Sequence, residues 1–378
     1  MINIISTNTF KQNLKALLKS VDVGINGKRP WDMKIKNEIV FKRILQEGSL
    51  GLGEAYMDGE WDCESLDEFF NKLLRGSIDK KIKKNLKLLA TIALSKIINH
   101  NSKEKSFEVG EHHYDIGNDL FKLMLDKRMV YTCGYWKNAK NLDQAQEDKL
   151  DLVCKKIGLK PGMRVLDIGG GWGSFAKFAA EKYKVNVVNV TVSKEQIALA
   201  NKLCKGLPVE NRLQDYRDIK GQQFDRVVSL GMFEHVNYKN YKTFMEIVSK
   251  NLKEDGLFLL HTLGGNISVT HLDPWTKKYI FPNSLVPSMK QITTAYEGLF
   301  VMEDWHNFGQ DYDKTLMTWF ENFDKNWPKL KTKYSKRFYR MWTYWLLSCA
   351  GAFRSRNLQL WQIVFSKKGI VGGYKSIR

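Results

Sequence analysis

Residues 163–173 read MRVLDIGGGWG, and this stretch decides the fold class. An apolar run that ends directly in closely spaced glycines is typical of a buried strand followed by a tight turn, where the backbone can approach a ligand. We therefore predict a strand over 163–168 and a helix over 174–184. In open parallel sheets, ligands bind outside the carboxyl ends of the strands, which is where this turn would lie.

The chain after this turn alternates between apolar strand patterns and helical patterns. Further strands are predicted over 185–190, 224–230, 256–261, 299–304 and 360–366. Helices are predicted over 194–205 and 239–253, and the aromatic-rich residues before the last strand are expected to form a helical insertion. The alternation predicts an α/β fold with a doubly wound, mostly parallel sheet that has helices on both faces.

The residues ahead of the sheet are predicted to be mainly helical. Helical spacing begins with a run of apolar residues near the N-terminus: Phe10, Leu14, Leu17, Leu18 and Val21. Residues 61–74 form another predicted helix, with Ser65 as a candidate N-cap. We predict a basic N-terminal lipid-binding domain over 1–98, a linker over 99–106 and a catalytic domain over 107–378.

The segment 80–98 is the strongest basic feature of this region. It has one apolar stripe and no acidic residue, and its other positions carry six lysines: Lys80, Lys81, Lys83, Lys84, Lys87 and Lys96. A basic amphipathic helix can lie on a membrane surface. It can equally pack against a core with its basic face in solvent, so both interpretations stay open.

The composition limits which kinds of partner and which cellular compartment are expected. The length of 378 residues indicates roughly two or three domains. The formal net charge of +19 indicates an anionic partner, either nucleic acid or an acidic membrane surface. No apolar run approaches the roughly 20 residues that span a bilayer. The N-terminus lacks the pattern of an export signal, and the five cysteines form no CxxC pair. We therefore expect a cytoplasmic protein with neither disulfides nor a metal site.

The glycine turn by itself is compatible with NAD, FAD or adenosylmethionine, or with a turn that binds nothing. Ser174 stands where a dinucleotide fingerprint has its third glycine, and no acidic residue ends the second strand. Asp167 ahead of the glycines favours adenosylmethionine. Gln196 and Asp215 are the nearest polar residues that can replace the missing acidic side chain.

Nine longer motifs lie between about residue 107 and residue 366: HYDIGNDLF (113–121), YTCGYW (131–136), VLDIGGGWG (165–173), LQDYRD (213–218), GMFEHV (231–236), LLHTLG (259–264), DPWTKKYIFPN (273–283), MEDWHNFGQDYDKTLMTW (302–319) and CAGAFRSRNLQLWQIVFS (349–366). In these motifs and in their order, the sequence resembles the cyclopropane-fatty-acyl-phospholipid synthases of the mycolic acid cyclopropane synthase family, which use S-adenosylmethionine. The family loop usually reads GCGWG, whereas this chain has Gly170 in place of the cysteine, and we expect little loss because backbone N–H groups bind the cofactor there. The resemblance implies the seven-stranded class I adenosylmethionine methyltransferase fold.

The resemblance implies transfer of a methylene group from S-adenosylmethionine to the cis double bond of unsaturated acyl chains in membrane phospholipids, giving cyclopropane fatty acids. Methylation of an alkene leaves a carbocation, which aromatic faces can stabilise, and a base must then remove a proton before the ring closes. The family's base is understood to be a bound bicarbonate. Its site maps onto the side chains of Glu234, His261 and Tyr312, with backbone groups of Cys133 and Leu263.

Each of these residues also has a purely structural explanation. Glu234 could balance a helix dipole, and His261 could be a hydrogen-bonded core histidine. Cys133 is expected to line the site without acting as a nucleophile, and Cys349 stays a weaker catalytic candidate because buried cysteines are usually structural. Five aromatic residues are candidates for an acyl channel or for plain core: Trp136, Tyr279, Phe281, Trp305 and Trp319.

The family's cofactor contacts carry over to the glycine turn and to three neighbouring segments, where Tyr216 is expected beside the adenine. These residues are Tyr131, Thr132, Leu166, Asp167, Ile168, Gly169, Gly170, Gly171, Trp172, Gly173, Ser174, Thr191, Val192, Ser193, Lys194, Glu195, Gln196, Asp215 and Tyr216.

The expected partner is unsaturated phospholipid in an anionic membrane surface, reached reversibly from the cytoplasmic side by a homodimer. Nucleic acid is not expected, because GMFEHV (231–236) stands where an RNA methyltransferase would carry an Asn/Asp-Pro-Pro-aromatic motif. Two alternatives stay open: a methyltransferase that gives methyl-branched acyl chains on the same lipids, and a lipid-binding protein without catalysis.

Overall fold

The structure is a computed structural model that describes residues 2–84 and 117–378, and the chain divides into two compact units. Unit 1 contains Met1–Met124, Leu272–Pro282 and Leu316–Asn357. Unit 2 contains Leu125–His271, Asn283–Thr315 and Leu358–Arg378. The units do not follow the predicted boundaries at residues 98 and 107, because late segments of the chain group with the N-terminal residues. The assignment of lipid binding and catalysis to two domains stays a prediction.

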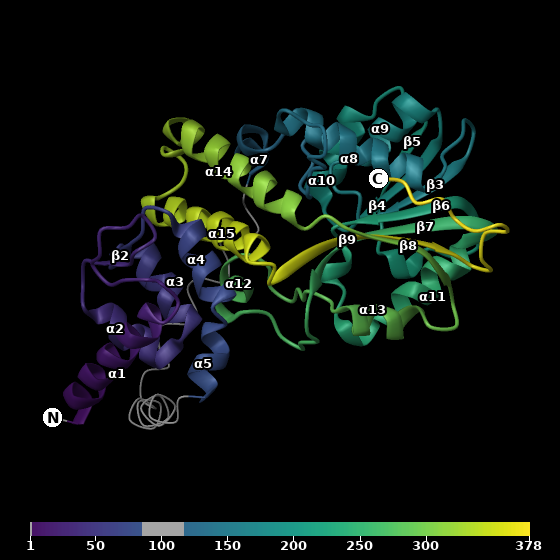
Figure 1. The fold of residues 1–378 in the computed structure, drawn as a ribbon. Coiled ribbons are helices and arrows are strands. Elements are labelled where there is room, and N and C mark those ends of the chain that lie inside the picture. Colours follow the sequence, from purple (N-terminus) through teal and green to yellow (C-terminus); the bar gives the residue numbers. More distant parts are fainter. Residues whose placement is uncertain (1, 85–116) are drawn as a thin grey trace. The chain divides into compact units, whose positions relative to one another are not determined.

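Unit 2 is built on a seven-stranded sheet within the described residues, with strand order β5-β4-β3-β6-β7-β9-β8 (Figure 1). The first five strands of this order are parallel, and β9 is antiparallel to both of its neighbours. This confirms the predicted mostly parallel, doubly wound sheet. The strands are β3 (Arg164–Ile168), β4 (Asn186–Thr191), β5 (Val209–Leu213), β6 (Phe224–Leu230), β7 (Leu252–Gly265), β8 (Val301–Asn307) and β9 (Leu358–Ser366).

Two strands differ from the prediction for physical reasons. β5 received no predicted bounds, because its sequence VENRL has little apolar alternation and the strand lies at the edge of the sheet with no buried residue. β7 is predicted over 256–261 but runs over 14 residues. Its carboxyl half pairs with β9 through Gly265, and this antiparallel partner extends the strand beyond its apolar centre.

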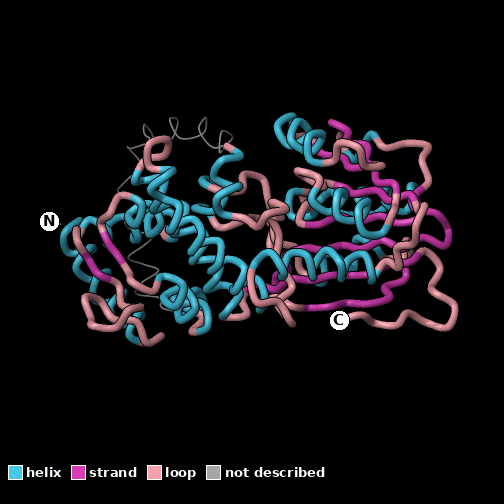
Figure 2. The backbone as a smooth tube through the Cα atoms, turned by 90° about the horizontal axis from the view of Figure 1, so that it is seen from above, coloured by secondary structure: helices cyan, strands magenta, loops and turns pink. Residues whose placement is uncertain are grey.

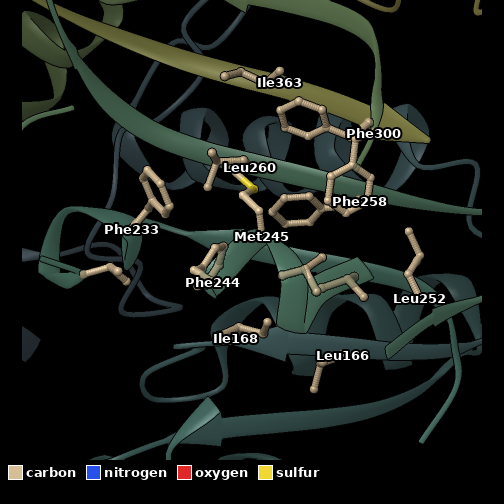
Figure 3. Close-up of a cluster of buried hydrophobic side chains, with 14 of the residues drawn as sticks. Leu166, Ile168, Phe233, Phe244, Met245, Leu252, Phe258, Leu260, Phe300 and Ile363 are labelled. Carbon is tan, nitrogen blue, oxygen red and sulfur yellow. The ribbon is translucent and has the colours of Figure 1, made fainter. Parts of the chain in front are cut away.

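The two faces of the sheet are covered by different helices (Figure 1). On one face, α8 (Leu142–Lys156) and α9 (Ser174–Tyr183) pack on alternate residues such as Val165 and Leu259. On the other, α11 (Tyr241–Asn251) and α13 (Met289–Tyr296) pack on residues such as Phe258 and Leu260; Figure 3 shows this cluster. Each fully buried side chain of this size contributes about 2 kcal/mol. Because strand residues alternate, side chains two apart share a face, and this places the polar residues of the site.

Unit 1 is mainly helical, as Figure 2 shows, and its N-terminal helices share one core with later segments. An added Cβ on Gly53 would lie 2.3 Å from Trp275, so the two segments are in close contact. Arg354 forms ion pairs with Asp67 and Glu68. The helices are α1 (Ile2–Lys19), α2 (Ile39–Glu47), α3 (Ser49–Met57), α4 (Leu66–Arg75), α5 (Ile78–Lys84), α7 (Asn118–Met124), α12 (Pro274–Tyr279), α15 (Lys336–Arg354) and most of α14 (Gln310–Leu330).

The aromatic insertion is helical as predicted, since it forms α14 and α15. The predicted helix over 61–74 begins later, at Leu66, because Trp61–Asp62 forms the short strand β2, which pairs with β1 (Lys34–Ile35). Ser65 occupies the predicted N-cap position, but its side chain makes no capping hydrogen bond within the described residues.

Only the start of the predicted basic helix 80–98 lies within the described residues. Lys80, Lys81, Lys83 and Lys84 belong to α5, and the Nζ of Lys81 donates to the backbone oxygen of Ser20 at 3.0 Å. The rest of this helix, with Lys87 and Lys96, and the linker 99–106 lie outside the described residues. Over 2–84 and 117–378, no helix is both long and apolar enough to cross a membrane.

A buried lysine of α8 binds the strand at the far end of the sheet. The side chain of Lys156 is 0% exposed, and its Nζ lies 2.9 Å from Nδ1 of His306 and 3.9 Å from a carboxylate oxygen of Asp304. Asp304 is also held by Arg378 and Ser376. Burial lowers the pKa of Lys156 to about 7.

This burial predicts a specific pH dependence of stability. In the unfolded chain a lysine has a pKa of about 10.4, so between about pH 7 and pH 10 the unfolded state binds one more proton than the folded state. The free energy of unfolding should therefore rise with pH by about 1 kcal/mol per unit from this residue. Denaturant unfolding between pH 7.5 and 9.5 (roughly the window that the two pKa values define) should show a slope that is steeper in the natural chain than in Lys156→Met by about this amount. The slope does not vanish in the variant, because the buried Lys149, with a pKa lowered to about 8, contributes to both chains.

The matched control is Lys155→Met, which removes the neighbouring lysine, whose side chain is 58% exposed and paired with Asp151. This variant should keep the slope of the natural chain. Parallel stability curves for the natural chain and Lys156→Met would show that Lys156 is charged in the folded protein.

Candidate active site

The glycine turn connects β3 to α9 through backbone conformations that favour glycine. Gly169, Gly171 and Gly173 have φ of +79°, +59° and +79°. An added Cβ on Gly169 would lie 2.5 Å from Cγ of Met232, so the turn packs closely on the residues that follow β6. The hydroxyl of Ser174 donates to the backbone oxygen of Arg128 at 2.8 Å. The turn is therefore held tightly in place at the carboxyl edge of the sheet.

Two polar side chains lie beneath this turn. Asp167 of β3 and Asn189 of β4 are Cα partners in the sheet, and both are 0% exposed. An added Cβ on Gly170 would lie 2.2 Å from Oδ2 of Asp167 and 2.3 Å from Oδ1 of Asn189. Among the described residues, neither oxygen of Asp167 has a hydrogen-bond partner. Burial raises the pKa of Asp167 to about 7, although Lys149 opposes the shift.

The residues after β4 are ordered by their own side chains. The hydroxyl of Thr191 donates to Oε1 of Gln196 at 2.7 Å. Ser193 caps α10 (Lys194–Leu203) by accepting from the backbone N–H of Gln196 at 3.3 Å, and Val192 between them is 73% exposed. The segment 191–196, predicted to contact the cofactor, therefore lies at the same sheet edge as the glycine turn.

Asp215 and Tyr216 follow β5, as expected from the sequence. The carboxylate of Asp215 accepts two hydrogen bonds from the guanidinium of Arg217, at 2.9 and 2.7 Å, which keeps its pKa low. The ring of Tyr216 packs edge-to-face on Phe244, with centroids 5.3 Å apart. Asp215 is thus ionised beside the segments that are predicted to bind the cofactor.

Residues 131–136 are fixed against the end of β6 by α8. The Nζ of Lys149 donates to the hydroxyl of Thr132 at 2.7 Å, and Nε2 of Gln146 donates to the backbone oxygen of Thr132 at 2.7 Å. An added Cβ on Gly231 would lie 2.6 Å from the methyl group of Thr132. The rings of Tyr131 and Trp172 lie 6.4 Å apart, so this segment also reaches the glycine turn.

The start of α14 holds the other end of this segment. The hydroxyl of Thr315 accepts from the backbone N–H of Gly134 at 3.1 Å, and Asp311 accepts from that of Trp136 at 2.7 Å. Tyr312 follows Asp311 on the first turn of α14. Cys133 is 0% exposed, and burial raises the pKa of its thiol well above the usual value. It is therefore a neutral thiol and a poor nucleophile.

Glu234 and His261 lie beside each other at the carboxyl ends of β6 and β7. His261 pairs with Leu230 of β6, and the backbone N–H of Leu263 donates to Oε1 of Glu234 at 2.6 Å. Nδ1 of His261 lies 3.3 Å from Nε2 of Gln362. Oε2 of Glu234 and Nε2 of His261 are buried and have no hydrogen-bond partner among the described residues. These two atoms can accept a ligand.

Burial shifts the pKa of both groups. It raises the pKa of Glu234, against the opposing effect of the Leu263 N–H. It lowers the pKa of His261 well below its usual value, and the buried Lys149 and Lys156 lower it further. The imidazole is therefore uncharged near neutral pH, and burial disfavours the charged form of the carboxyl group.

Lys149 is a site residue that sequence reasoning missed. It is 0% exposed, and burial lowers its pKa to about 8, while the nearby Asp126, Cys133 and Asp167 raise it. The sequence did contain a signal for its burial. Lys149 and Lys156 lie on the apolar stripe of α8 together with Leu142, Ala145 and Val153, and all of these residues are buried.

Cys349 belongs to unit 1, in α15, whereas Glu234 and His261 belong to unit 2. Burial raises the pKa of its thiol to about 12, which does not favour a nucleophilic thiolate. A catalytic role for Cys349 stays an untested prediction.

The aromatic channel candidates also divide between the units. Tyr279, Phe281 and Trp319 belong to unit 1, and Trp136 and Trp305 to unit 2. Trp305 packs on the core residue Trp361, with ring centroids 5.1 Å apart. The described residues contain no cluster of three or more His, Cys, Asp or Glu that could hold a metal ion.

The sequence profile described as mycolic acid cyclopropane synthetase matches residues 101–363. The chain is 53% identical over 362 residues to the cyclopropane-fatty-acyl-phospholipid synthase of Escherichia coli K12, covering 96% of this chain and 94% of that protein. It is 35% identical over 284 residues to a probable fatty acid methyltransferase of Pseudomonas putida, covering 71% of each.

Among solved structures, the fold is similar to mycolic acid cyclopropane synthase CmaA1 complexed with SAH and CTAB. The TM-score is 0.63 at 30% identity, covering 68% of this chain and 97% of that one. The profile match and the high identity over nearly the whole chain identify this protein as a member of the mycolic acid cyclopropane synthetase family of S-adenosylmethionine-dependent transferases.

Proposed function

We propose that this enzyme transfers a methylene group from S-adenosylmethionine across the cis double bond of acyl chains in membrane phospholipids, giving cyclopropane fatty acids. The observation that carries the proposal is the buried pair Glu234 and His261, which leaves two buried polar atoms without a partner among the described residues. The Escherichia coli relative, 53% identical, is named for this activity.

The residues at the glycine turn fit S-adenosylmethionine. An added Cβ on Gly171 would meet only Nε2 of Gln196, at 3.9 Å, so the backbone there is open to a ligand. Asp167 offers two carboxyl oxygens without partners among the described residues. Together with 131–132, 191–196 and 215–216, these groups would hold the cofactor, which supplies the methyl carbon and leaves as S-adenosylhomocysteine.

The second site fits a bicarbonate ion. A carboxylate beside a bicarbonate would be a repulsive like-charge contact, but burial favours the protonated form of Glu234. A protonated Oε2 can donate a hydrogen bond to an anion. The backbone N–H of Leu263 already donates to Glu234, so Leu263 supports the site through this carboxyl group. Tyr312 and Cys133 complete the proposed set.

Ring formation needs two bond changes. The π electrons of the alkene form a bond to the methyl carbon while the carbon–sulfur bond breaks. A base then takes one proton from the new methyl group, and the electrons of that C–H bond close the ring. A bound bicarbonate would supply this base, and Glu234 and His261 would hold it in place and exclude water.

We propose further that the enzyme works as a homodimer in the cytoplasm and binds anionic membranes reversibly through the lysines of 80–98. Each basic residue near an anionic leaflet contributes about 1 kcal/mol, so a few lysines suffice for reversible binding. The net charge of +19 supports this electrostatic attachment.

A second candidate is a methyltransferase that gives methyl-branched chains on the same lipids. The similarity to the probable fatty acid methyltransferase of Pseudomonas putida favours it. The two candidates share the first bond-forming step and differ in the fate of the methyl protons.

The product of the purified enzyme tests the proposal. With S-adenosylmethionine and vesicles of a cis-unsaturated phospholipid, each modified chain should gain one CH₂ by mass spectrometry and should take up no hydrogen under conditions that reduce alkenes. His261→Ala should lower the rate by about 100-fold or more, because it removes a group that holds the base.

The control for this variant is His271→Ala, which removes an exposed histidine of unit 2 and should keep full activity. A product that still takes up hydrogen as an alkene would exclude ring formation and favour the methyltransferase. An unchanged lipid pool with the natural enzyme would favour a binding protein.

A change at Gly170 tests the cofactor-binding turn. Gly170→Ala places a Cβ 2.2 Å from Oδ2 of Asp167 and 2.3 Å from Oδ1 of Asn189, so both side chains must move, at a cost of about 1–3 kcal/mol. The affinity for S-adenosylmethionine, measured by calorimetry, should fall by about 10-fold. The double variant Gly170→Ala/Asn189→Ala should recover only part of it, since it removes the contact with Asn189 and leaves the contact with Asp167. Equal affinity of Gly170→Ala and the natural chain would contradict this packing.

Membrane attachment is tested by reversing the charge of Lys80, Lys81, Lys83 and Lys84 to Glu. Sedimentation with phosphatidylglycerol vesicles should weaken on the order of 100-fold at low salt, because four attractions become repulsions. The control changes four exposed lysines of unit 2 to Glu: Lys182, Lys202, Lys205 and Lys220. Binding by the first variant that persists at high salt would exclude an electrostatic anchor in this helix.

A further inference from the structure

A row of buried polar side chains crosses the three last strands of the sheet. Cα pairing places His261 of β7 opposite Gln362 of β9, and Gln362 opposite His306 of β8. Directly paired residues of neighbouring strands point to the same face. Phe308 contacts both histidine rings, with centroids 6.0 Å from His261 and 4.8 Å from His306. The three polar side chains therefore lie side by side on one face.

Gln362 is the central member of this row. It is 0% exposed, and its Nε2 lies 3.3 Å from Nδ1 of His261. An amide nitrogen is a donor only, so the ring nitrogen that faces it must accept and cannot carry a proton. In His261 the ring proton is thus displaced to Nε2.

We propose that Gln362 is a positioning residue that fixes His261 in the tautomer with a bare Nδ1 and a protonated Nε2. The Nε2–H of His261 is then a hydrogen-bond donor, buried and without a partner among the described residues. His261 consequently donates to a ligand of the site and does not act as its general base.

The consequence for catalysis rests on the proposed function. A bicarbonate ion needs donors around it, and a neutral histidine with a bare Nε2 would repel its oxygens. With Nε2 protonated, His261 would offer such a donor. The imidazole would then hold the ion and would not itself take the proton from the substrate.

The tautomer is measurable without substrate or cofactor. In ¹⁵N-histidine-labelled protein, two-bond ¹⁵N–¹H correlation spectra distinguish the protonated ring nitrogen from the bare one. The chain has 7 histidines, and the signals missing from His261→Ala identify the residue. We expect His261 to show a protonated Nε2 and a bare Nδ1. A protonated Nδ1 would overturn the proposal, and this result requires no variant of Gln362.

Gln362→Glu provides the sharper change, because a carboxylate accepts from Nδ1–H and so moves the proton to that nitrogen. We expect the spectrum to report a protonated Nδ1 and kcat to fall by about 100-fold, with the affinity for S-adenosylmethionine retained. Unchanged turnover in a variant with the proton on Nδ1 would overturn the proposal.

The matched control is Gln359→Glu, which places the same charge on the same strand. Gln359 accepts from Nδ2 of Asn307 at 3.1 Å, a bond that a glutamate can keep. This control should retain the natural His261 spectrum and turnover. A natural enzyme that forms no cyclopropane would refute the proposed function but leave the tautomer result intact, so the two failures are distinguishable.

Discussion

The hydrogen bond between Lys149 and Thr132 affects both the charge within the site and the position of the loop beside it. An amine buried in the protein interior loses its hydration, and this loss must be offset by polar partners. Lys149 finds the hydroxyl of Thr132 at 2.7 Å and lies near Asp126 and Asp167. The same contact fixes residues 131–136 and places positive charge close to His261. The order of this loop thus depends on one helix face. Lys149 also adds to the effect of burial in lowering the pKa of His261, whereas it opposes the burial that raises the pKa of Asp167.

The sheet was predictable from the sequence because its strands have strong local patterns. FDRVVSL predicts a strand over 224–230, and β6 has these bounds. VLDIGGGWG predicts both the turn and its place at the sheet edge, because three glycines adopt positive φ there. The bounds of the edge strand β5 were harder to predict, since a strand with no fully buried residue needs no apolar alternation.

The polar network around the site was less predictable because it depends on pairing between strands. Gln362 lies in the apolar run LQLWQIVFS, and nothing local shows that it faces His261 across β7 and β9. The same holds for Asn189, which lies beside Gly170 only because β3 and β4 pair in that register. The sequence led us to expect little effect from glycine at position 170. In the structure, the side chain of Asn189 lies in the space that a side chain at position 170 would need.

The composition of unit 1 has a consequence for synthesis in the cell. Asp67 pairs with Arg354, 287 residues later, and Glu54 pairs with Lys278, 224 residues later. At a synthesis rate of roughly 5–20 residues per second, the early helices leave the ribosome on the order of ten seconds to a minute before these partners do. During that time, apolar residues such as Phe69 and Trp61, buried in the finished fold, have only part of their core. Nascent chains of this protein should therefore depend on ribosome-associated chaperones more than do nascent chains of proteins whose domains are continuous in sequence.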